Sequence, residues 1–581
     1  MTAIIGDASR RVVRRPQPTR RSQAVFELKA TLLRARRTAI ELGRAPPRLA
    51  RATDRDGFDR LVAQSVTPLW SDPSLSEAAM QFGKVQNLRR AAIALDGRVL
   101  APGAVFSFWR HVGRATPGRG FASGRMLREG CMVAAVGGGL CQLSNDLYDV
   151  ALSAGCRIVE RHAHSHRVPG SAAAVGRDAT VAWNYVDLRF EAPAPMWLSV
   201  KLGARDLVVS LLARGAAPAL GAEPGAPPAL APNLREAASC GSCDQTDCHL
   251  YERRNGAVIV GRSAFLVDEA WPEFAAYVAA ARRPEDVIGL ASARRWSTAG
   301  FAEVHEARMP GALRSLGWRL TPPQGAARRS ADARATARIA AALARRLAPD
   351  IAEVTVAQSM LPYLWRDGAL GGRRFQVLMT RLPMGVLQAR LDTAFATHPD
   401  RATLADYRAD LALAEAEAEA LAAADAVITP HAEIAALFGE RATRLDWRRP
   451  AAPVGAPRPG DVFAFPGPTV ARKGAFELRD AALRLGATLR PLGAELEGPG
   501  FWSGVAIDPP TDRVAWLDGV RAVVLPALAE AAPRGLLTAL AAGVPVIVTA
   551  ACGLDPQPGL TLVPMGDADA LAAAMAATGA F

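Results

Sequence analysis

LPALAEAAPRGLLTALAAGVPVIVTAACGL, Leu525 to Leu554, is the stretch of this sequence that decides the fold of the C-terminal half. A short apolar run leads to Glu530, a helical segment follows, and Gly543-Val-Pro opens a second apolar run. Short apolar runs on either side of a helix are typical of buried parallel strands. The pattern therefore places the Glu530 carboxylate at the C-terminal end of a strand, which is where α/β sheets bind ligands.

The same pattern continues towards the N-terminus. AVITP (Ala426 to Pro430) and AVVLP (Ala522 to Pro526) are short apolar runs, each beside a helical segment. The alanine-rich residues 409–426 consist of strong helix formers and predict one long helix. Gly368 to Met384 contains a Gly-Gly pair before Arg373 and Arg374, which we interpret as a substrate loop. These features predict two α/β domains, residues 262–450 and 451–581.

A second motif, FPGPTVARKG, spans Phe465 to Gly474. Its cations Arg472 and Lys473 lie at the start of a helical segment, where a diphosphate can be stabilised electrostatically. With the Glu530 segment, this motif resembles the donor site of retaining glycosyltransferases with two Rossmann domains, the GT-B type. The resemblance implies a nucleotide-sugar donor. We expect the following residues to bind the donor, with Arg472 supplying the charge of the family's missing arginine: Gly467, Arg472, Lys473, Gly474, Glu530 and Gly543.

Two positions depart from that family's pattern. The family's arginine after Gly467 is Pro468 here, and its second glutamate, seven residues after the first, is Thr538. The sequence after Asp567 also leaves little room for the family's closing helix. These departures keep open the alternative of a degenerate transferase fold that binds without catalysis. His431, in DAVITPHAEIAALF, is expected at the turn that closes the first of the two domains.

The N-terminal part carries a different motif, Gly137-Gly138-Gly139-Leu140-Cys141-Gln142-Leu143-Ser144-Asn145. Leu143, Leu147 and Val150 fall on one helical face, so Cys141 is expected at a helix start, where the macrodipole favours a thiolate. The glycine turn can also offer N–H groups to an oxyanion. A buried structural cysteine is the alternative.

Histidines and carboxylates follow this cysteine. His162, His164 and His166 alternate along an expected strand, so their side chains could converge on one face. Asp178 or Asp187 could orient an imidazole. We predict a thiol nucleophile site made of Cys141, His164 and Asp178. The His-x-His-x-His run also suits a transition metal, and this alternative stays open.

Four motifs in one order carry a second resemblance: LAPGAVFSFWRHVG (100–113), the glycine–cysteine motif, ERHAHSHRVPG and GRDATVAWNYVDLRF. From about Gln86 to Leu212 they resemble the VanW family, named from vancomycin B-type resistance clusters. Asn145 stands where many relatives carry Thr or Ser. The resemblance implies a role at the cell envelope or in glycopeptide resistance, but it implies no reaction. The stretches VDLRFEA, MWLSVKL and DLVVSLLA are expected to form one sheet.

The remaining segments complete the predicted organisation. Residues 1–57 form a basic arm and an amphipathic helix, which either packs on a neighbouring domain or lies on an acidic membrane. Residues 58–214 form the α+β VanW-like domain, and 215–235 an Ala/Pro/Gly linker. Residues 236–261 hold a cysteine cluster whose spacing suits one zinc ion or an iron–sulfur cluster, against the alternative of reduced thiols. Its candidate ligands are Cys240, Cys243, Cys248 and His249.

Bulk properties set the expected partners and compartment. The 581 residues carry a formal net charge of +13, much of it arginine before Arg60, and 7 cysteines. No apolar run is long enough to cross a bilayer and no signal-peptide pattern opens the sequence, so we expect a cytoplasmic protein, peripheral at the inner membrane face if the basic helix binds lipid. No nucleic-acid partner is expected.

The expected fold is thus multidomain: an α+β VanW-like domain followed by two α/β Rossmann-like domains of the GT-B type. The expected function is transfer of a hexose from a nucleotide-sugar to a cell-envelope or polysaccharide acceptor, with a cysteine-dependent activity in the VanW-like domain. The alternative is a non-catalytic binding protein with a degenerate transferase fold.

Overall fold

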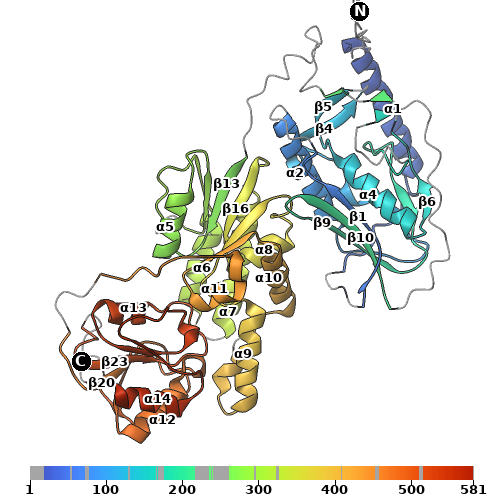
Figure 1. Cartoon of the computed structure of the whole chain (residues 1–581). Helices are drawn as coiled ribbons and strands as arrows, with labels where there is room; N and C mark the ends of the chain where they lie inside the picture. Colours follow the sequence, from blue (N-terminus) through green and yellow to red (C-terminus); the bar gives the residue numbers. More distant parts are fainter. Residues whose placement is uncertain are drawn as a thin grey trace, which may run out of the picture. The chain divides into compact units, whose positions relative to one another are not determined.

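The computed structural model divides the chain into two compact units, Met1–Val260 and Gly261–Phe581 (Figure 1). It describes the following residues: 19–52, 55, 57–71, 77–128, 131–164, 166–167, 176–215, 235–236, 238–239, 261–292, 296–321, 326–406, 408–451, 457–509 and 515–579. The predicted linker from residue 216 and all four candidate metal ligands from Cys240 to His249 lie outside these residues.

The N-terminal unit is built on a four-stranded antiparallel sheet in the order β1-β10-β9-β2. Its strands are β1 (Arg60–Pro68), β10 (Asp206–Ala213), β9 (Met196–Leu202) and β2 (Arg98–Leu100). Helix α4 (Leu140–Ser153) packs on β1 and β10, and α2 (Ala78–Leu95) packs on β9 (Figure 1). The predicted apolar face of α4 is fully buried at Leu143, Leu147 and Val150. This burial fixes the start of α4, and with it Cys141, against the sheet.

Smaller sheets surround this core, and one expectation about them is wrong. Strand β8 (Arg189–Glu191), from the VDLRFEA stretch, pairs with β3 (Val105–Ser107) and β6 (Arg157–Glu160) instead of joining β9 and β10. Pro193 and Pro195 separate β8 from β9, and a proline cannot donate to a ladder, so the chain leaves one sheet before it enters the next.

Other short elements complete the N-terminal unit. They are α3 (Phe108–Val112), η2 (Pro117–Arg119), β4 (Ser123–Arg128), β5 (Cys131–Val136), β7 (His166–Arg167), β11 (Arg235–Glu236) and β12 (Ala238–Ser239). β12 pairs with β5, and β11 pairs with β7.

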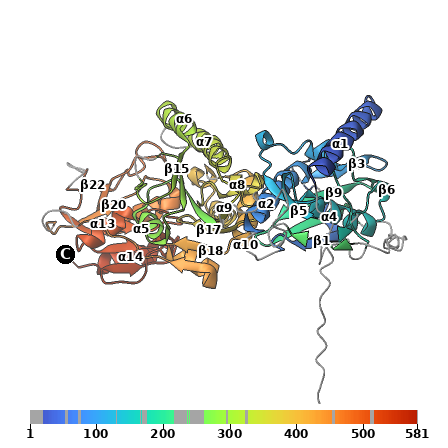
Figure 2. The same cartoon turned by 90° about the horizontal axis from the view of Figure 1, so that it is seen from above.

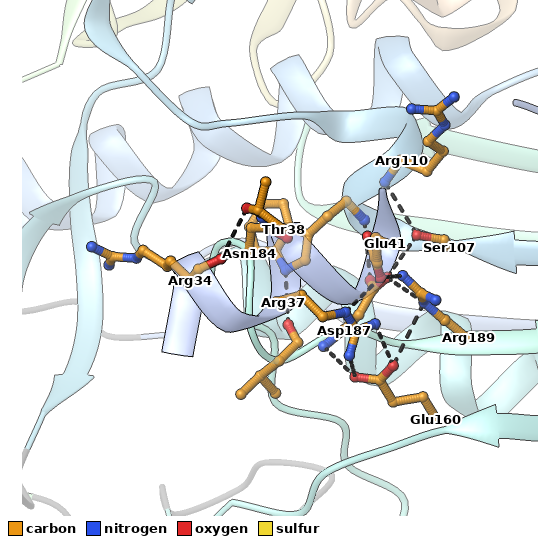
Figure 3. Close-up of polar contacts among 12 residues, drawn as sticks. Arg34, Arg37, Thr38, Glu41, Ser107, Arg110, Glu160, Asn184, Asp187 and Arg189 are labelled. Atoms are coloured by element: carbon orange, nitrogen blue, oxygen red, sulfur yellow. Dashed lines mark hydrogen bonds and ion pairs between the residues drawn. The ribbon is translucent and has the colours of Figure 1, made fainter. Parts of the chain in front are cut away.

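Helix α1 (Arg20–Glu41) begins at a capping box formed by Thr19 and Ser22 and is attached to the N-terminal unit through polar contacts. Arg37 forms an ion pair with Glu160 at 2.6 Å, and Glu41 accepts from Arg189 (Figure 3). Ala30 is its only buried residue.

The first domain of the C-terminal unit is a seven-stranded parallel sheet in the order β15-β14-β13-β16-β17-β18-β19. The strands are β13 (Arg262–Val267), β14 (Val287–Leu290), β15 (Glu303–Glu306), β16 (Ile351–Ala357), β17 (Arg374–Leu378), β18 (Ala426–Thr429) and β19 (Ala442–Arg444). The order reverses between β13 and β16, as in a doubly wound Rossmann-like sheet.

Helices connect these strands. They are α5 (Pro272–Ala281), α6 (Arg308–Leu320), α7 (Ala326–Ala344), α8 (Leu361–Arg366), α9 (Met384–Thr397), η7 (Ala402–Asp406), α10 (Leu411–Ala423), α11 (Ala432–Phe438) and η8 (Gly439–Arg441). α10 lies within the predicted long helix, and α6 and α7 lie side by side (Figure 2).

The second domain is a six-stranded parallel sheet in the order β22-β21-β20-β23-β24-β25. The strands are β20 (Val462–Phe465), β21 (Thr488–Pro491), β22 (Ala506–Ile507), β23 (Val520–Leu525), β24 (Val546–Val548) and β25 (Leu560–Leu562). Its helices are η9 (Ala471–Lys473), α12 (Ala475–Leu485), α13 (Arg534–Ala541), η10 (Ala550–Cys552) and α14 (Ala568–Ala577). The order reverses between β20 and β23.

The interpretation of Arg373 as part of a substrate loop is wrong. Its side chain is buried, and its guanidinium donates to the carbonyl oxygens of Ile351, Ala369 and Ala348. Burial lowers the pKa of Arg373 to about 10. The residue therefore ties loop carbonyls together inside the domain instead of facing a substrate.

No helix among the described residues is long and apolar enough to cross a membrane.

Candidate functional site

The glycine turn places Cys141 in the first turn of α4. Gly139 precedes the helix with a φ of 96°, which favours glycine, and no side chain caps the helix there. A Cβ at Gly138 would lie 2.3 Å from the carbonyl oxygen of Gly124, so only glycine lets this turn approach β4. Asn87, fully buried on α2, donates to the carbonyl of Gly138 at 2.8 Å. The glycine turn thus places Cys141 in the first turn of α4, at the positive end of the helix dipole.

His164 lies between Cys141 and Asp178. Its Nδ1 is 2.7 Å from Oδ2 of Asp178, and its backbone N–H donates to the same oxygen at 2.6 Å. The imidazole also shares a side-chain hydrogen bond with the Cys141 thiol, which contributes to the pKa of both groups. The structure thus brings together all three residues that the sequence predicted for a thiol site.

Arg161 fixes the orienting carboxylate. It donates to Oδ1 of Asp178 at 2.8 Å and to the Asp178 carbonyl at 2.7 Å, and its guanidinium stacks over the ring of Tyr148 on α4. The side chains of Asp178 and His164 are only 5% and 13% exposed. Asp178 therefore has little freedom to turn away from the imidazole.

The electrostatics of this site favour a charged pair. Burial alone would raise the pKa of Cys141, but its hydrogen bond to His164 and the charge of that imidazole outweigh burial, so the pKa lies below its ordinary value. Burial would lower the pKa of His164, but hydrogen bonds to Asp178 and Cys141 raise it to about 9. A thiolate beside an imidazolium is the form of Cys141 and His164 that these shifts stabilise.

Helix α4 also holds the Asp178 segment directly. The side-chain oxygen of Asn145 accepts from the backbone N–H of Ala179 at 2.8 Å, and the Ser144 hydroxyl donates to the carbonyl of Ala179 at 2.5 Å. The Cys141 thiol lies 3.8 Å from the carbonyl oxygen of Val181. Asn145 thus has a positioning role.

Several other candidates lie elsewhere. Residues 161–164 do not form the expected strand, and His162 is exposed, 3.5 Å from Glu160, so His162 and His164 do not share a face. Asp187 is buried and bonded to Ser107 and Arg189 instead of an imidazole. The side chain of His166 is outside the described residues. Within the described ranges, no group of three or more His, Cys, Asp or Glu could hold a metal ion.

The second candidate site lies in the last domain, where the strand order reverses. Lys473 follows β20 and Glu530 follows β23, so both reach the switch point of the sheet, the usual ligand site of such sheets. The Lys473 ammonium is 2.7 Å from Oε2 of Glu530 and also donates to the Ala529 carbonyl at 3.2 Å. Each side chain is 10% exposed. The two predicted donor-site motifs therefore meet at one place.

The charge balance there keeps Glu530 ionised. Burial alone would raise the pKa of Glu530, but the charge and hydrogen bond of Lys473 outweigh burial and lower it, with a further contribution from Arg472. The backbone of Arg472 accepts from the N–H of Leu528 at 2.9 Å, which joins the two motifs. The carboxyl ends of β20 and β23 are therefore followed by one cation and one carboxylate, which are paired with each other.

The glycines predicted here have steric roles. Gly474 has a φ of 76°, and a Cβ on it would lie 2.1 Å from the carbonyl oxygen of Pro526. Gly543 has a φ of 79° in the turn before β24. The carbonyl of Gly467 lies against Gly493, where a Cβ would come within 2.4 Å of it. Gly474 in particular allows the Lys473 turn to reach the strand that carries Glu530.

Two features of the C-terminal unit were not predicted: the contact that His431 makes with the Glu530 loop, and a pocket in the first domain. His431 is buried at the start of α11, and its Nε2 donates to the carbonyl oxygen of Glu530 at 3.0 Å, so the first domain contacts the Glu530 loop. A pocket lies at the switch point of the first domain, lined by residues that include Asp268, Trp271, Ser359 and Thr380. Asp268 follows the apolar run of β13, a signal equivalent to the one that marked Glu530.

Comparison with known proteins supports this division. Residues 83–212 match the family model described as VanW like protein. The chain is 35% identical over 127 residues to YoaR of Bacillus subtilis, and 37% identical over 112 residues to vancomycin B-type resistance protein VanW of Enterococcus faecalis. These matches cover 22% and 19% of this chain, and 41% of each relative. The chain thus spans less than half the length of the curated relatives it matches.

The C-terminal unit has its own matches. Residues 492–578 match the family model described as Glycosyl transferases group 1. Among solved structures, sucrose-phosphate synthase of Thermosynechococcus elongatus is 16% identical with a TM-score of 0.37, over 54% of this chain and 89% of that one. HepE of Anabaena, in complex with UDP and glucose, is 14% identical with a TM-score of 0.31, over 54% and 89%.

The two family matches fall in separate units, on the two sets of motifs described above. The chain joins a VanW-like domain to a unit of two Rossmann-like domains, and the second of these domains carries the match to glycosyl transferases group 1.

Proposed function

We propose that the C-terminal unit transfers a hexosyl group from a nucleotide-sugar donor to a cell-envelope or polysaccharide acceptor. The observation that carries this proposal is the Lys473–Glu530 pair at the switch point of the last sheet. The Lys473 ammonium can bind the diphosphate of the donor and stabilise the charge that develops on the leaving group. The Glu530 carboxylate can accept hydrogen bonds from hydroxyls of the nucleotide-sugar.

The acceptor class is proposed from the N-terminal match, because the relative VanW is named as a vancomycin B-type resistance protein. We also propose a cytoplasmic location, peripheral at the inner membrane face, and the surface of helix α1 supports the membrane contact. Val25, Leu28 and Leu32 are exposed at helical spacing on it, beside the cations Lys29 and Arg36. An apolar stripe flanked by cations suits the surface of an anionic membrane.

The donor can be tested by thermal stabilisation of the whole protein. UDP- and GDP-hexoses are screened for a rise in Tm, since a ligand at 100 times its Kd adds about 2.7 kcal/mol to the free energy of unfolding. We expect one donor to raise Tm, and K473M to abolish the rise because the diphosphate loses its cation. R484A is the matched control, since Arg484 is an exposed cation of α12 paired with Asp569. Absence of any donor effect, or an equal effect in K473M, would contradict the proposal.

One observation favours the second candidate function, donor binding without transfer. The Thr538 hydroxyl, at the position of the family's second glutamate, donates to the Arg534 carbonyl within α13 at 2.8 Å and offers no carboxylate. Release of free nucleotide from the stabilising donor, in the presence of polysaccharide acceptors, separates the two. Turnover that K473M abolishes supports transfer, and saturable binding with no nucleotide release supports the binding protein.

A further inference from the structure

The N-terminal unit carries a second constellation that glycosyl transfer does not use. We propose that Cys141, His164 and Asp178 form a thiol nucleophile site for acyl compounds, in which Cys141 attacks the carbonyl carbon of an ester or amide. The proposed thiol site contains no residue of the C-terminal unit, so a test of this site does not depend on whether the C-terminal unit binds a donor.

The geometry separates this site from a lone buried cysteine. The ring of His164 is shared between the Cys141 thiol and Asp178, with Nδ1 2.7 Å from the carboxylate. Asp178 in turn is held by Arg161 at 2.8 Å and by the backbone N–H of His164 at 2.6 Å. A nucleophile, a base and a group that orients the base are the three parts that covalent acyl transfer needs.

The surroundings of the sulfur favour the same chemistry. Cys141 is half-buried, whereas Cys156 and Cys552 are buried, and burial raises the pKa of both of those thiols to about 12. Cys141 alone of these three combines an imidazole partner with a position in the first turn of a 14-residue helix. The positive end of the helix dipole at that turn favours negative charge on the sulfur.

The proposed reaction balances with water as its only co-reactant. The thiolate forms a C–S bond to the carbonyl carbon, and the π electrons move to the oxygen. The tetrahedral intermediate then collapses and expels an alcohol or amine, which takes the Nε2 proton of the His164 imidazolium. The neutral imidazole then removes a proton from water, whose oxygen attacks the thioester. Release of the carboxylic acid restores the Cys141 thiolate and the imidazolium.

The roles of the three residues differ. Cys141 and His164 touch the reacting atoms, so both are proposed as catalytic residues. Asp178 acts through His164 and is a positioning residue: its carboxylate fixes Nδ1 as the protonated nitrogen on that side and so presents Nε2 to the sulfur. Ser144 and Asn145 extend this positioning, since they tie α4 to the residue after Asp178.

Alkylation of the full-length protein by iodoacetamide, followed by peptide mass spectrometry, tests the thiolate. At about pH 6 we expect Cys141 to react at least about tenfold faster than in H164Q, because an ordinary thiol is almost fully protonated there. Cys156 and Cys552 are internal controls that should stay unmodified. H162Q is the matched control, because His162 is exposed and lies against Glu160. Melting curves check that each variant is folded.

D178N distinguishes positioning from a purely structural role. We expect the pH profile of Cys141 alkylation to move towards that of an ordinary thiol, because the imidazolium loses its carboxylate partner. D149N is its control, since Asp149 pairs with Arg177 on another face of α4. An unchanged profile in folded D178N would contradict the proposed role of Asp178.

Acyl transfer is tested with p-nitrophenyl acetate and a p-nitroanilide of the same acyl group. We expect an acetyl adduct on Cys141, identified by mass spectrometry, that forms in wild type and H162Q but not in C141S. Release of nitroaniline as well extends the substrate class to amides, and release of nitrophenol alone restricts it to esters. The proposal is overturned if Cys141 is not acylated by either probe, or if H164Q reacts with iodoacetamide as fast as wild type.

Discussion

At the scale of single residues, Lys84 is a lysine that becomes buried because it packs beside the glycine turn. Its side chain is 5% exposed on α2 and packs against Gly139, where a Cβ would lie 2.2 Å from its Cγ. Within the part of the chain that the structure describes, the ammonium donates to Ser71 Oγ at 3.3 Å. Burial, reinforced by the charge of Arg125, lowers the pKa of Lys84 to about 7. The residue fills space beside the turn, and burial of its ammonium away from water disfavours the charged form.

This residue predicts a pH dependence of stability. The unfolded chain protonates Lys84 with an ordinary pKa of 10.5, whereas the folded chain does so only near 7. The contribution of neutral Lys84 to the free energy of unfolding is therefore fully present above pH 10.5, the pKa in the unfolded chain, and is lost as pH falls through 7. Between these values the free energy of unfolding should rise with pH by up to about 1.4 kcal/mol per unit. K84M should remove this slope.

The measurement is chemical unfolding monitored by hydrogen exchange in peptides of α2 and α4. Because both helices belong to the N-terminal unit, their exchange reports on the stability of that unit alone. K201M is the control, because Lys201 is half exposed and paired with Asp96. An identical slope in K84M and wild type would show that Lys84 titrates normally in the folded protein.

At the scale of elements, α1 is held by its arginines and not by an apolar face. Arg37 and Glu160 are 18% and 17% exposed in their side chains and meet at 2.6 Å (Figure 3). Arg34 donates to the carbonyl of Trp183 at 2.7 Å. Trp183 lies in the segment that follows Asp178, which connects α1 to the neighbourhood of the thiol site. The apolar residues of α1 remain on the exposed side.

R37A should therefore loosen α1. Loss of the guanidinium leaves Glu160 half-buried without that partner, at an expected cost on the order of 1–3 kcal/mol. Amide exchange in α1 should speed up by about tenfold or more, since 1.4 kcal/mol is a factor of ten. R36A, which removes an exposed cation one position earlier, should change exchange little. Equal exchange in R37A and R36A would contradict this account of α1.

At the scale of the whole molecule, each of the two units has hydrophobic cores of its own among the described residues. One core belongs to the N-terminal unit, and the others lie beyond residue 260. Within the C-terminal unit the two sheets are tied together. Arg534 of the second domain forms an ion pair with Glu273 of the first at 2.5 Å and stacks on Trp271 and Trp447. The C-terminal unit should therefore fold as one body of two domains.

A protein made of residues 261–581 should consequently fold alone and unfold in one cooperative transition, because its cores are internal. We expect calorimetry to show the same transition temperature for this unit as in the full chain, within about 2 °C. R534A in the same fragment should split or broaden the transition. A fragment that fails to fold, or a transition unaffected by R534A, would show that stability comes from elsewhere.

The sequence alone determined the features that depend on local periodicity and on the stereochemistry of single residues. Apolar runs and helical segments in alternation gave the two parallel sheets, and Gly139 and Gly474 marked positions where only glycine fits. The motifs also supplied Cys141 with candidate histidine and carboxylate partners, among them His164 and Asp178. Local sequence could do this because strand and helix periods, and positive φ, depend on neighbours along the chain.

Only the tertiary structure decided which of these residues meet. It selected His164 over His162 and Asp178 over Asp187, supplied Asn87 and His431 as unforeseen partners, and moved VDLRFEA into a separate sheet. These outcomes depend on packing between segments far apart in the sequence, such as α2 against the glycine turn. Periodicity says which face of an element is buried, but not which distant residue it is buried against.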